Sequence, residues 1–375
     1  MKIKAAVVYE QGLAKPYTES RAVTVEEVDL DGPGPGEVLV KIVAAGVCHS
    51  DLSVVNGNRA RPIPIVIGHE GSGIVEEVGA GVDDLVVGDH VVFIFMPNCG
   101  TCLNCRQGRP SSCIEGNTAN AAGVLLSGKR RLSIGGTPLN HYAGVSCFAE
   151  YAVSDRRSLI KIPKDLPFDV AAVFSCAVIT GVGAVVNTAK VPLGASVGVV
   201  GLGGVGLSAM LGARAAGARK IVGIDPVKYK RDEAKQMGAD LVFDSNDPDV
   251  VEAIREATGG GLEYVFEAAG ETEAIELAYA ITARGGTTTS SGLSNPTKNF
   301  SVSHVQLVSE ERTIKGSFLG SCIPMRDIPN YIELYRDGKL PVDQLVKGTI
   351  RLDQINEAFD LLDSGETVRQ VIVFD

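Results

Sequence analysis

The chain has 375 residues, more than a single hydrophobic core usually supports, and this length predicts two domains. Its formal net charge is −10, and the charges form no long acidic or basic runs. Nucleic acid and anionic membranes attract basic surfaces, so this balance argues against both as partners. We therefore expect a small-molecule ligand.

The N-terminal residues alternate like a strand and lack the apolar core and cleavage site of a secretion signal. Two uncharged stretches, Val170 to Ala189 and Val191 to Ala213, are long enough to span a membrane. Polar residues in the first, and Pro192 with several glycines in the second, favour buried core elements instead. We expect a cytoplasmic protein, in which the eight cysteines are metal ligands or buried thiols rather than disulfides.

The predicted elements change in character along the chain. The first 150 or so residues contain short β-rich runs separated by glycine and proline, which predict an antiparallel β domain. After about residue 180, strands alternate with helices, beginning SVGVV, GLSAMLGARAAGA, KIVGID, and this order predicts a parallel, doubly wound sheet. From about Pro324, two amphipathic segments predict helices, and VRQVIVFD predicts a closing strand.

A glycine-rich turn, GLGGVG, lies between an apolar strand and a helix. Gly201, Gly203 and Gly206 match the dinucleotide-binding pattern, and we include the adjacent Gly204. Glycines at these places permit a tight turn and let a pyrophosphate approach the free amides at the helix N-terminus. This segment therefore predicts a dinucleotide site.

Asp225 ends the next strand, where a carboxylate accepts hydrogen bonds from the adenosine ribose hydroxyls. Because it would repel a 2′-phosphate, NAD is favoured over NADP. Lys228 and Lys230 follow at the start of the next helix, where most lysines are solvated. We retain Lys230 as a candidate contact to the ribose.

Four cysteines occur within CGTCLNCRQGRPSSC, namely Cys99, Cys102, Cys105 and Cys113. Four thiolates fit a closed tetrahedral zinc site. An iron–sulfur cluster also takes four cysteines, but the seven-residue gap before the fourth and the absence of a Cys-Pro ending favour zinc. A zinc ion with four protein ligands has no open position, so we predict that this site is structural.

A catalytic zinc needs three protein ligands and an open position. The remaining cysteines are Cys48, Cys147, Cys176 and Cys322, and the chain has five histidines. Two informative places, CHSD at 48–51 and GHE at 68–70, lie next to apolar β runs. Spacing alone does not connect either place to Cys176.

Seven motifs in order resemble the zinc-dependent medium-chain alcohol dehydrogenases: GPGPGEVLVKIVAAGVCHSD, GHEGSGIVEEVGAGV, VGDHV, the four-cysteine segment, FSCAVITGVGAV, GLGGVG and GETVRQVIVF. The resemblance implies that Cys48, His69 and Cys176 bind a catalytic zinc and that the four-cysteine segment binds the family's structural zinc. It implies two zinc ions per chain, NAD, and an alcohol or aldehyde substrate. It also implies an α/β fold, with a GroES-like β-rich catalytic domain at 1–177 and 321–375 and an inserted Rossmann domain at 178–320.

The resemblance also assigns roles near the catalytic metal. Ser50 matches the hydroxyl that takes the substrate proton, although a relay histidine expected three residues later is replaced by Ser53. Asp51 matches the carboxylate that orients the zinc-bound His69, and Glu70 matches an acidic residue behind the metal.

For the cofactor, His49 and Arg369 match positions that contact the cofactor phosphates, and we assign Thr180 to the cofactor site. From spacing alone, Arg369 would be an ordinary surface charge. Cys147 and Cys322 match no functional position, so we expect buried thiols there.

The substrate is less well defined by the sequence. Phe95, Leu319 and the loop from Thr118 to Tyr142 match pocket positions in relatives, which favours a primary or aromatic alcohol. An alternative is a thiol-dependent formaldehyde dehydrogenase that acts on S-hydroxymethyl thiols. Arg59 and Arg61 stand where glutathione-dependent members have acidic residues, which weakens the glutathione version and leaves another thiol possible.

Two further expectations concern assembly and a competing class. The long segment between Cys113 and Cys147 is typical of dimeric rather than tetrameric members, and we expect a homodimer paired through the strands after Gly286 and Ile314. A zinc-free quinone reductase-like protein or a non-catalytic relative that binds the cofactor is the remaining alternative, but either would lack the catalytic ligands present here.

Overall fold

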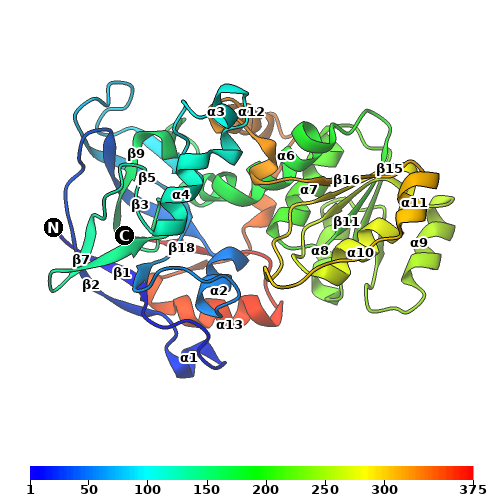
Figure 1. Cartoon of the computed structure of the whole chain (residues 1–375), viewed down its shortest axis with the longest axis horizontal. Helices are drawn as coiled ribbons and strands as arrows, with labels where there is room; N and C mark the ends of the chain where they lie inside the picture. Colours follow the sequence, from blue (N-terminus) through cyan, green and yellow to red (C-terminus); the bar gives the residue numbers. More distant parts are fainter. Residues whose placement is uncertain (375) are drawn as a thin grey trace. The chain divides into compact units, whose positions relative to one another are not determined.

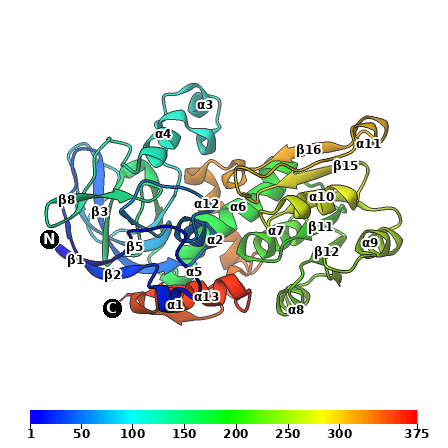
Figure 2. The same ribbon diagram turned by 60° about the horizontal axis from the view of Figure 1, so that its bottom comes forward.

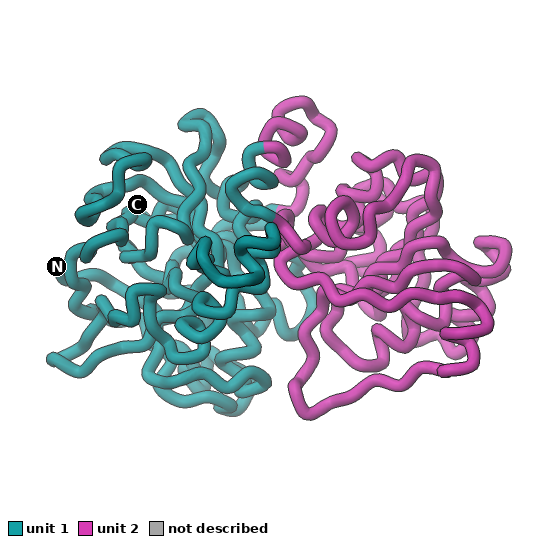
Figure 3. The backbone as a smooth tube through the Cα atoms, turned by 45° about the horizontal axis from the view of Figure 1, so that its top comes forward, with its two compact units in different colours: residues 1–176, 323–329, 346–375 teal, residues 177–322, 330–345 magenta. Residues whose placement is uncertain are grey.

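The computed structural model describes residues 1–374, and the chain divides into two compact units (Figure 3). Unit 1 contains residues 1–176, 323–329 and 346–375, and unit 2 contains residues 177–322 and 330–345. Residues 330–345, which the sequence-based division gave to the first domain, lie in unit 2. The reason is tertiary packing, because the turn Val342–Leu345 contacts helix α7 (Gly204–Ala215).

Unit 1 is built on two sheets (Figure 1). The first is a closed barrel of strands β1 (Lys2–Val8), β2 (Thr24–Leu30), β7 (Leu132–Ile134), β8 (Thr137–His141) and β4 (Ile65–Val66). The second has the order β10 (Leu159–Ile162), β6 (His90–Phe93), β5 (Glu70–Val78), β3 (Glu37–Gly46), β18 (Val371–Val373) and β17 (Thr349–Ile350), with β9 (Tyr151–Asp155) also paired to β3. The antiparallel prediction for the first 150 or so residues is right for most pairs, but β4 and β8 are parallel. Later in the chain, β17 and β18 are parallel as well.

Strand β3 illustrates why these residues form a sandwiched strand. Val38, Val40 and Ile42 pack into one core cluster, whereas the intervening Leu39 packs into another. Alternate side chains of a strand point to opposite faces, so an almost wholly apolar run suits a strand that is covered on both sides.

Unit 1 also contains several helices. They are α1 (Tyr17–Ser20), α2 (His49–Val55), α3 (Leu103–Arg106), α4 (Ile114–Ala122), α5 (Phe168–Val173) and α13 (Ile355–Ser364). Ile355, Ala358, Phe359 and Leu362 form the buried stripe of α13, at the spacing of one helix face. The predicted C-terminal helices are confirmed as α12 (Pro324–Arg336) and α13, and the predicted closing strand as β18.

Unit 2 contains one parallel sheet of six strands (Figure 2). Its order is β13 (Leu241–Phe243), β12 (Lys220–Ile224), β11 (Ser196–Val200), β14 (Leu262–Glu267), β15 (Thr282–Ser290) and β16 (Thr313–Gly316). The connecting helices are α6 (Ile179–Gly183), α7, α8 (Lys228–Gln236), α9 (Val250–Thr258), α10 (Thr272–Ala280) and α11 (His304–Ser309). The chain starts at the central strand β11 and winds to each side in turn, which confirms the doubly wound prediction.

One apolar helical run, Phe168–Ala189, is long enough to cross a membrane, but 89% of its most apolar window is buried within the protein. The prediction of a core element at Val170 to Ala189 is therefore confirmed. The run includes two π-helical turns, Phe174–Val178 and Ala184–Ala189, and the first contains Cys176. Such turns often occur at functional sites.

Candidate active site and metal centres

Three neighbouring strands bring distant segments of unit 1 to one edge of a sheet. Gly46 at the end of β3 pairs with Glu70 at the start of β5 and with Val371 at the start of β18. Cys48 follows the end of β3, and Arg369 precedes the start of β18. The antiparallel register therefore gathers chemistry-bearing residues from positions near 48, 70 and 369.

Cys48, His69, Glu70 and Cys176 form a buried group in which one potential ligand atom from each residue lies within 4.8 Å of all the others. The soft thiolates and the imidazole are typical ligands of zinc. The structure thus brings together the three residues that the resemblance assigns to a catalytic metal, with Glu70 beside them. Their role as ligands stays a prediction.

Asp51 organises this group from helix α2. Its Oδ2 accepts a hydrogen bond from the Cys48 amide at 3.3 Å and caps the helix, while its Oδ1 accepts from the Gly68 amide at 3.2 Å and lies 2.9 Å from Nδ1 of His69. With Nδ1 held in this way, Nε2 of His69 presents its lone pair, and this buried atom has no hydrogen-bond partner among the described residues. A nitrogen that makes no hydrogen bond, close to two cysteine sulfur atoms, is a donor set that fits a zinc ion.

The electrostatics of the group favour a cation. Burial alone would lower the pKa of His69, but the Asp51 carboxylate raises it well above 6.5. The hydrogen bond with Cys176 lowers the pKa of Cys48 well below 9, despite complete burial. The Asp51 carboxylate and a thiolate at Cys48 place negative charge at the ligand group, and this charge favours a metal cation.

Glu70 and Arg369 form a fully buried ion pair behind the ligand group. Burial raises the pKa of Glu70 to about 8, and the charge of Arg369 opposes that rise. A side chain at position 46 would collide with this pair, so Gly46 is required for close approach. Arg369 is therefore not the surface charge that spacing alone suggests, and its role at cofactor phosphates stays a prediction.

Near Ser50, the Ser53 side chain is bonded within helix α2, whereas Ser50 and His49 are at least partly exposed. Ser53 donates its hydroxyl to the His49 carbonyl at 2.8 Å, so this side chain is used within helix α2. Ser50 is part-exposed, two residues from Cys48, and its carbonyl accepts a hydrogen bond from the Tyr142 hydroxyl at 3.0 Å. His49 is exposed at the first position of α2.

The four-cysteine segment forms a separate group in unit 1, again with one ligand atom from each residue within 4.8 Å of the others. Amides of the same segment donate to the sulfur atoms: Cys99 to Sγ of Cys113 at 3.2 Å, Cys102 to Sγ of Cys99 at 3.2 Å, and Gly116 to Sγ of Cys113 at 3.3 Å. These donors stabilise thiolates and fit a four-thiolate metal. Cys113 is buried, whereas Cys99, Cys102 and Cys105 are part-exposed.

In unit 2 the glycine turn lies between β11 and α7. Gly201 has φ +91°, and a Cβ there or at Gly206 would collide with backbone atoms, so both glycines are required by the fold. A Cβ at Gly203 would meet nothing within 4 Å. Packing does not require glycine at 203, and the open space at the start of α7, beside Gly204, suits a bound phosphate.

Asp225 is held beside this turn. Its two carboxylate oxygens accept hydrogen bonds from the amides of Leu202 and Val227, each at 2.8 Å. The side chain thus supports the turn in addition to its predicted contact with the ribose. Lys228 forms an exposed ion pair with Asp232, and Lys230 is half-buried with no ion pair among the described residues.

Three other residues considered in the sequence, Thr180, Cys147 and Cys322, are buried. The Thr180 hydroxyl is buried without a hydrogen-bond partner among residues 1–374, which leaves it available for a ligand. Cys147 and Cys322 are buried, as predicted.

The comparisons with known proteins cover the whole chain. A model of the "Alcohol dehydrogenase GroES-like domain" matches residues 34–164, and one of the "Zinc-binding dehydrogenase" family matches residues 204–337. The chain is 41% identical over 377 positions to "Putative alcohol dehydrogenase D" of Mycobacterium tuberculosis, with 100% of both chains covered. It is 36% identical over 384 positions to an S-(hydroxymethyl)glutathione dehydrogenase of Paracoccus denitrificans, again with 100% of both covered.

The crystal structure of benzyl alcohol dehydrogenase from Acinetobacter calcoaceticus is also similar, with 35% identity, a TM-score of 0.93 and 100% of both chains covered. The chain belongs to the zinc-dependent medium-chain alcohol dehydrogenase family. The GroES-like and Rossmann parts that the sequence predicted are thereby confirmed.

Sequence reasoning missed one contact in this zinc-dependent dehydrogenase. Phe95 and Tyr142 meet the His69 ring edge-on, with centroids 5.4 and 5.6 Å away, and so fix its plane. Burial raises the pKa of the Tyr142 hydroxyl well above 10, whereas the positive charges of Arg59 and Arg61 oppose that rise. The sequence indicated Phe95 and Tyr142 only as pocket positions.

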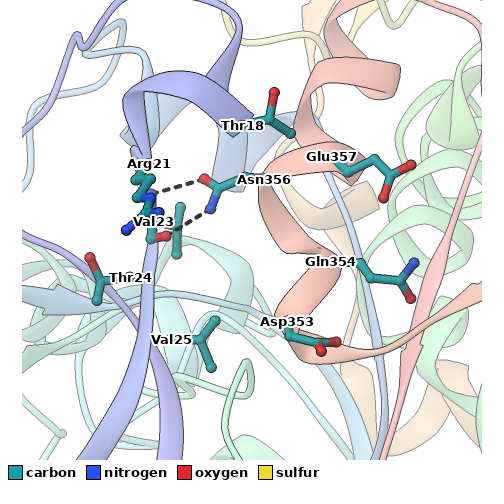
Figure 4. Close-up of a pocket in the computed structure, with 9 residues that line it drawn as sticks. All are labelled: Thr18, Arg21, Val23, Thr24, Val25, Asp353, Gln354, Asn356 and Glu357. Atoms are coloured by element: carbon teal, nitrogen blue, oxygen red, sulfur yellow. Dashed lines mark hydrogen bonds between the residues drawn. The ribbon is translucent and has the colours of Figure 1, made fainter.

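A pocket of about 480 Å³ lies in another part of unit 1, between strand β2 and helix α13 (Figure 4). Its walls are joined by two hydrogen bonds between Val23 and Asn356, at 2.8 and 3.0 Å. Arg21 lines it, and neither metal-ligand group does.

Proposed function

We propose that the chain is an NAD-dependent zinc alcohol dehydrogenase that interconverts primary or aromatic alcohols and their aldehydes. The observation that carries this proposal is the buried group of Cys48, His69 and Cys176, in which His69 Nε2 has no hydrogen-bond partner among the described residues while its Nδ1 is held by Asp51. A zinc-free reductase has no need for such a group.

Cys48, His69 and Cys176 would hold a zinc ion, which would act as a Lewis acid that makes an alcohol hydroxyl more acidic and polarises a carbonyl. The chain's own side chains then have distinct tasks. Asp51 fixes the tautomer of His69, and Glu70 with Arg369 forms a neutralised ion pair behind the ligands. Ser50 takes the proton of the substrate hydroxyl, since the Ser53 hydroxyl is donated to backbone.

NAD supplies the hydride acceptor. The turn at Gly201, Gly203, Gly204 and Gly206 holds its pyrophosphate, and Asp225 binds the adenosine ribose. We assign Lys230 to the same ribose in a separate contact, because its ammonium group has no ion pair among the described residues.

Three further side chains complete the proposed cofactor contacts. His49 and Arg369 bind cofactor phosphates, and the unpartnered Thr180 hydroxyl contacts the cofactor.

The reaction is R–CH2–OH + NAD⁺ → R–CHO + NADH + H⁺. The C–H hydrogen would pass to NAD with its electron pair as hydride, and the hydroxyl proton would leave by way of Ser50. The four cysteines would hold the second zinc, which would stabilise the fold.

A panel of alcohols with NAD and with NADP tests this function. We expect oxidation of 1-hexanol and benzyl alcohol with NAD, weak activity with NADP, and about two zinc ions per chain by elemental analysis. Zinc at one ion per chain with no oxidation of any alcohol would contradict the proposal.

A second candidate is a thiol-dependent formaldehyde dehydrogenase, which the 36% identity to an S-(hydroxymethyl)glutathione dehydrogenase favours. Formaldehyde with and without glutathione, or another thiol, separates the two. Oxidation that requires the thiol would favour this candidate.

We also propose a cytoplasmic homodimer paired along β16, the edge strand of the parallel sheet. A mass consistent with two chains in solution would support this assembly.

A further inference from the structure

The loop between α2 and β4 is fixed in place by Gln11. The Gln11 side chain donates to the carbonyls of Val54 at 2.6 Å and Arg59 at 3.2 Å, and its Oε1 accepts from the Arg61 amide at 3.2 Å. The Arg59 amide in turn donates to the Ser53 carbonyl at 2.8 Å, in helix α2. The two arginines are therefore anchored at their backbones to the helix that begins next to Cys48.

Their charged groups lack partners. Among residues 1–374, neither Arg59 nor Arg61 forms an ion pair, although the chain carries an excess of carboxylates. Nε of Arg59 is buried and makes no hydrogen bond. A buried donor without a partner costs free energy, and a ligand that accepts a hydrogen bond there would recover it.

The Arg59 backbone is bonded to Ser53, in the same helix as Ser50, so this loop adjoins the segment that carries the proposed proton acceptor. Burial raises the pKa of the Tyr142 hydroxyl, and the positive charges of Arg59 and Arg61 oppose that rise. Tyr142 donates to the Ser50 carbonyl and contacts the His69 ring. Two uncompensated cations thus accompany the proton acceptor and a zinc ligand.

We infer that Arg59 and Arg61 form a subsite for an anionic group of the substrate, so that the enzyme prefers alcohols that carry a carboxylate. This inference rests on the proposed function. A planar guanidinium matches the geometry of a carboxylate and binds it with charge-assisted hydrogen bonds. The carboxylate is either part of the alcohol or part of a thiol that carries a hydroxymethyl group.

Matched substrates that differ in one charge test the subsite: neutral 1-hexanol, the anionic hydroxy acid 6-hydroxyhexanoate and the cationic amino alcohol 6-amino-1-hexanol. With NAD, we expect the hydroxy acid to have a KM about tenfold or more below that of the neutral alcohol, and the amino alcohol to have the highest KM. The preference should weaken as salt rises, because salt screens exposed charges. Oxidation of formaldehyde is also compared with glutathione and with uncharged 2-mercaptoethanol. A lower KM with glutathione would show that the anion is carried by a thiol.

Arg59→Gln and Arg61→Gln should each raise the KM for the hydroxy acid, or for the glutathione adduct, about tenfold and leave the kinetics of hexanol oxidation within twofold. Arg59→Lys should restore part of the preference. Arg21→Gln is the matched control, since it removes an exposed arginine from the pocket of Figure 4, and it should change the kinetics of neither substrate.

Oxidation of hexanol with no preference for either anionic substrate, or a preference that survives both glutamine variants, would overturn the subsite and leave the proposed function intact. If no alcohol or thiol adduct is oxidised, the proposed function fails, and the subsite fails with it.

Discussion

The two cysteine groups of unit 1 differ in how far apart their donors lie along the chain and in how they are buried. Cys99, Cys102, Cys105 and Cys113 come from one segment, and amides of that segment bind their sulfur atoms. Cys48, His69 and Cys176 come from three separate segments and are all buried. A local segment suits a metal that stabilises the fold, whereas convergent segments can leave a position open for chemistry.

The largest expected effect is the loss of activity when a ligand is removed from the convergent group of Cys48, His69 and Cys176. Cys48→Ser should lower kcat/KM for hexanol oxidation by about a thousandfold or more, because it removes a zinc ligand and with it several kcal/mol of transition-state stabilisation. The melting temperature, followed by circular dichroism, is the control for folding. Near wild-type turnover in a folded Cys48→Ser protein would contradict the assignment.

The next effect is a difference in kcat between substitutions of two serines in helix α2. Ser50→Ala should lower kcat about a hundredfold, as expected for loss of a group that accepts the substrate proton. Ser53→Ala should change kcat by less than about threefold, because its hydroxyl is donated to the His49 carbonyl. Steady-state rates for both variants decide this, and comparable losses would show that Ser50 is not the proton acceptor.

A substitution in the local group of Cys99, Cys102, Cys105 and Cys113 should lower stability rather than activity. Cys102→Ser should lower the melting temperature by about 5 °C or more, since a structural zinc contributes to the free energy of folding. At a temperature where the variant is folded, we expect kcat/KM within about twofold of wild type. Arg106→Gln, a nearby exposed substitution that spares the sulfur atoms, should leave the melting temperature unchanged.

The smallest expected effect is on stability at acidic pH, and it comes from His141, which belongs to neither cysteine group. Burial lowers the pKa of His141 from 6.5 to about 4, and its Nε2 accepts a hydrogen bond from the Arg131 amide at 3.0 Å. The unfolded chain therefore binds a proton that the folded chain does not between pH 6.5 and 4, so His141 costs stability as pH falls through this window.

We expect about 2 kcal/mol of this loss by about pH 5. His141→Gln keeps a hydrogen-bond acceptor and removes the titration, so its melting temperature should fall less between about pH 7 and pH 5 than that of the wild type. An equal fall in both proteins would refute the role of His141.

The sequence allowed prediction of those features whose physics is local. The cysteine spacing indicated one metal group, and the glycine turn between a strand and a helix indicated the dinucleotide site. The convergence of Cys48, His69 and Cys176 depends on the pairing of β3 with β5 and on a π-helical turn at Cys176, which spacing does not encode. Only the family resemblance joined these residues.

Other features escaped because they depend on contacts between distant segments. Glu70 and Arg369 are 299 positions apart, and neither motif predicts that they form a buried ion pair. Likewise, the parallel pairing of β17 with β18 and the position of residues 330–345 in unit 2 follow from tertiary packing.

Zinc content measured together with turnover tests most directly whether the two cysteine groups have separate roles. In wild type, Cys48→Ser and Cys102→Ser proteins, we expect about two, one and one zinc ions per chain, with hydride transfer lost only in Cys48→Ser. A stable Cys102→Ser protein without turnover, beside an active Cys48→Ser protein, would mean that the two sites are reversed.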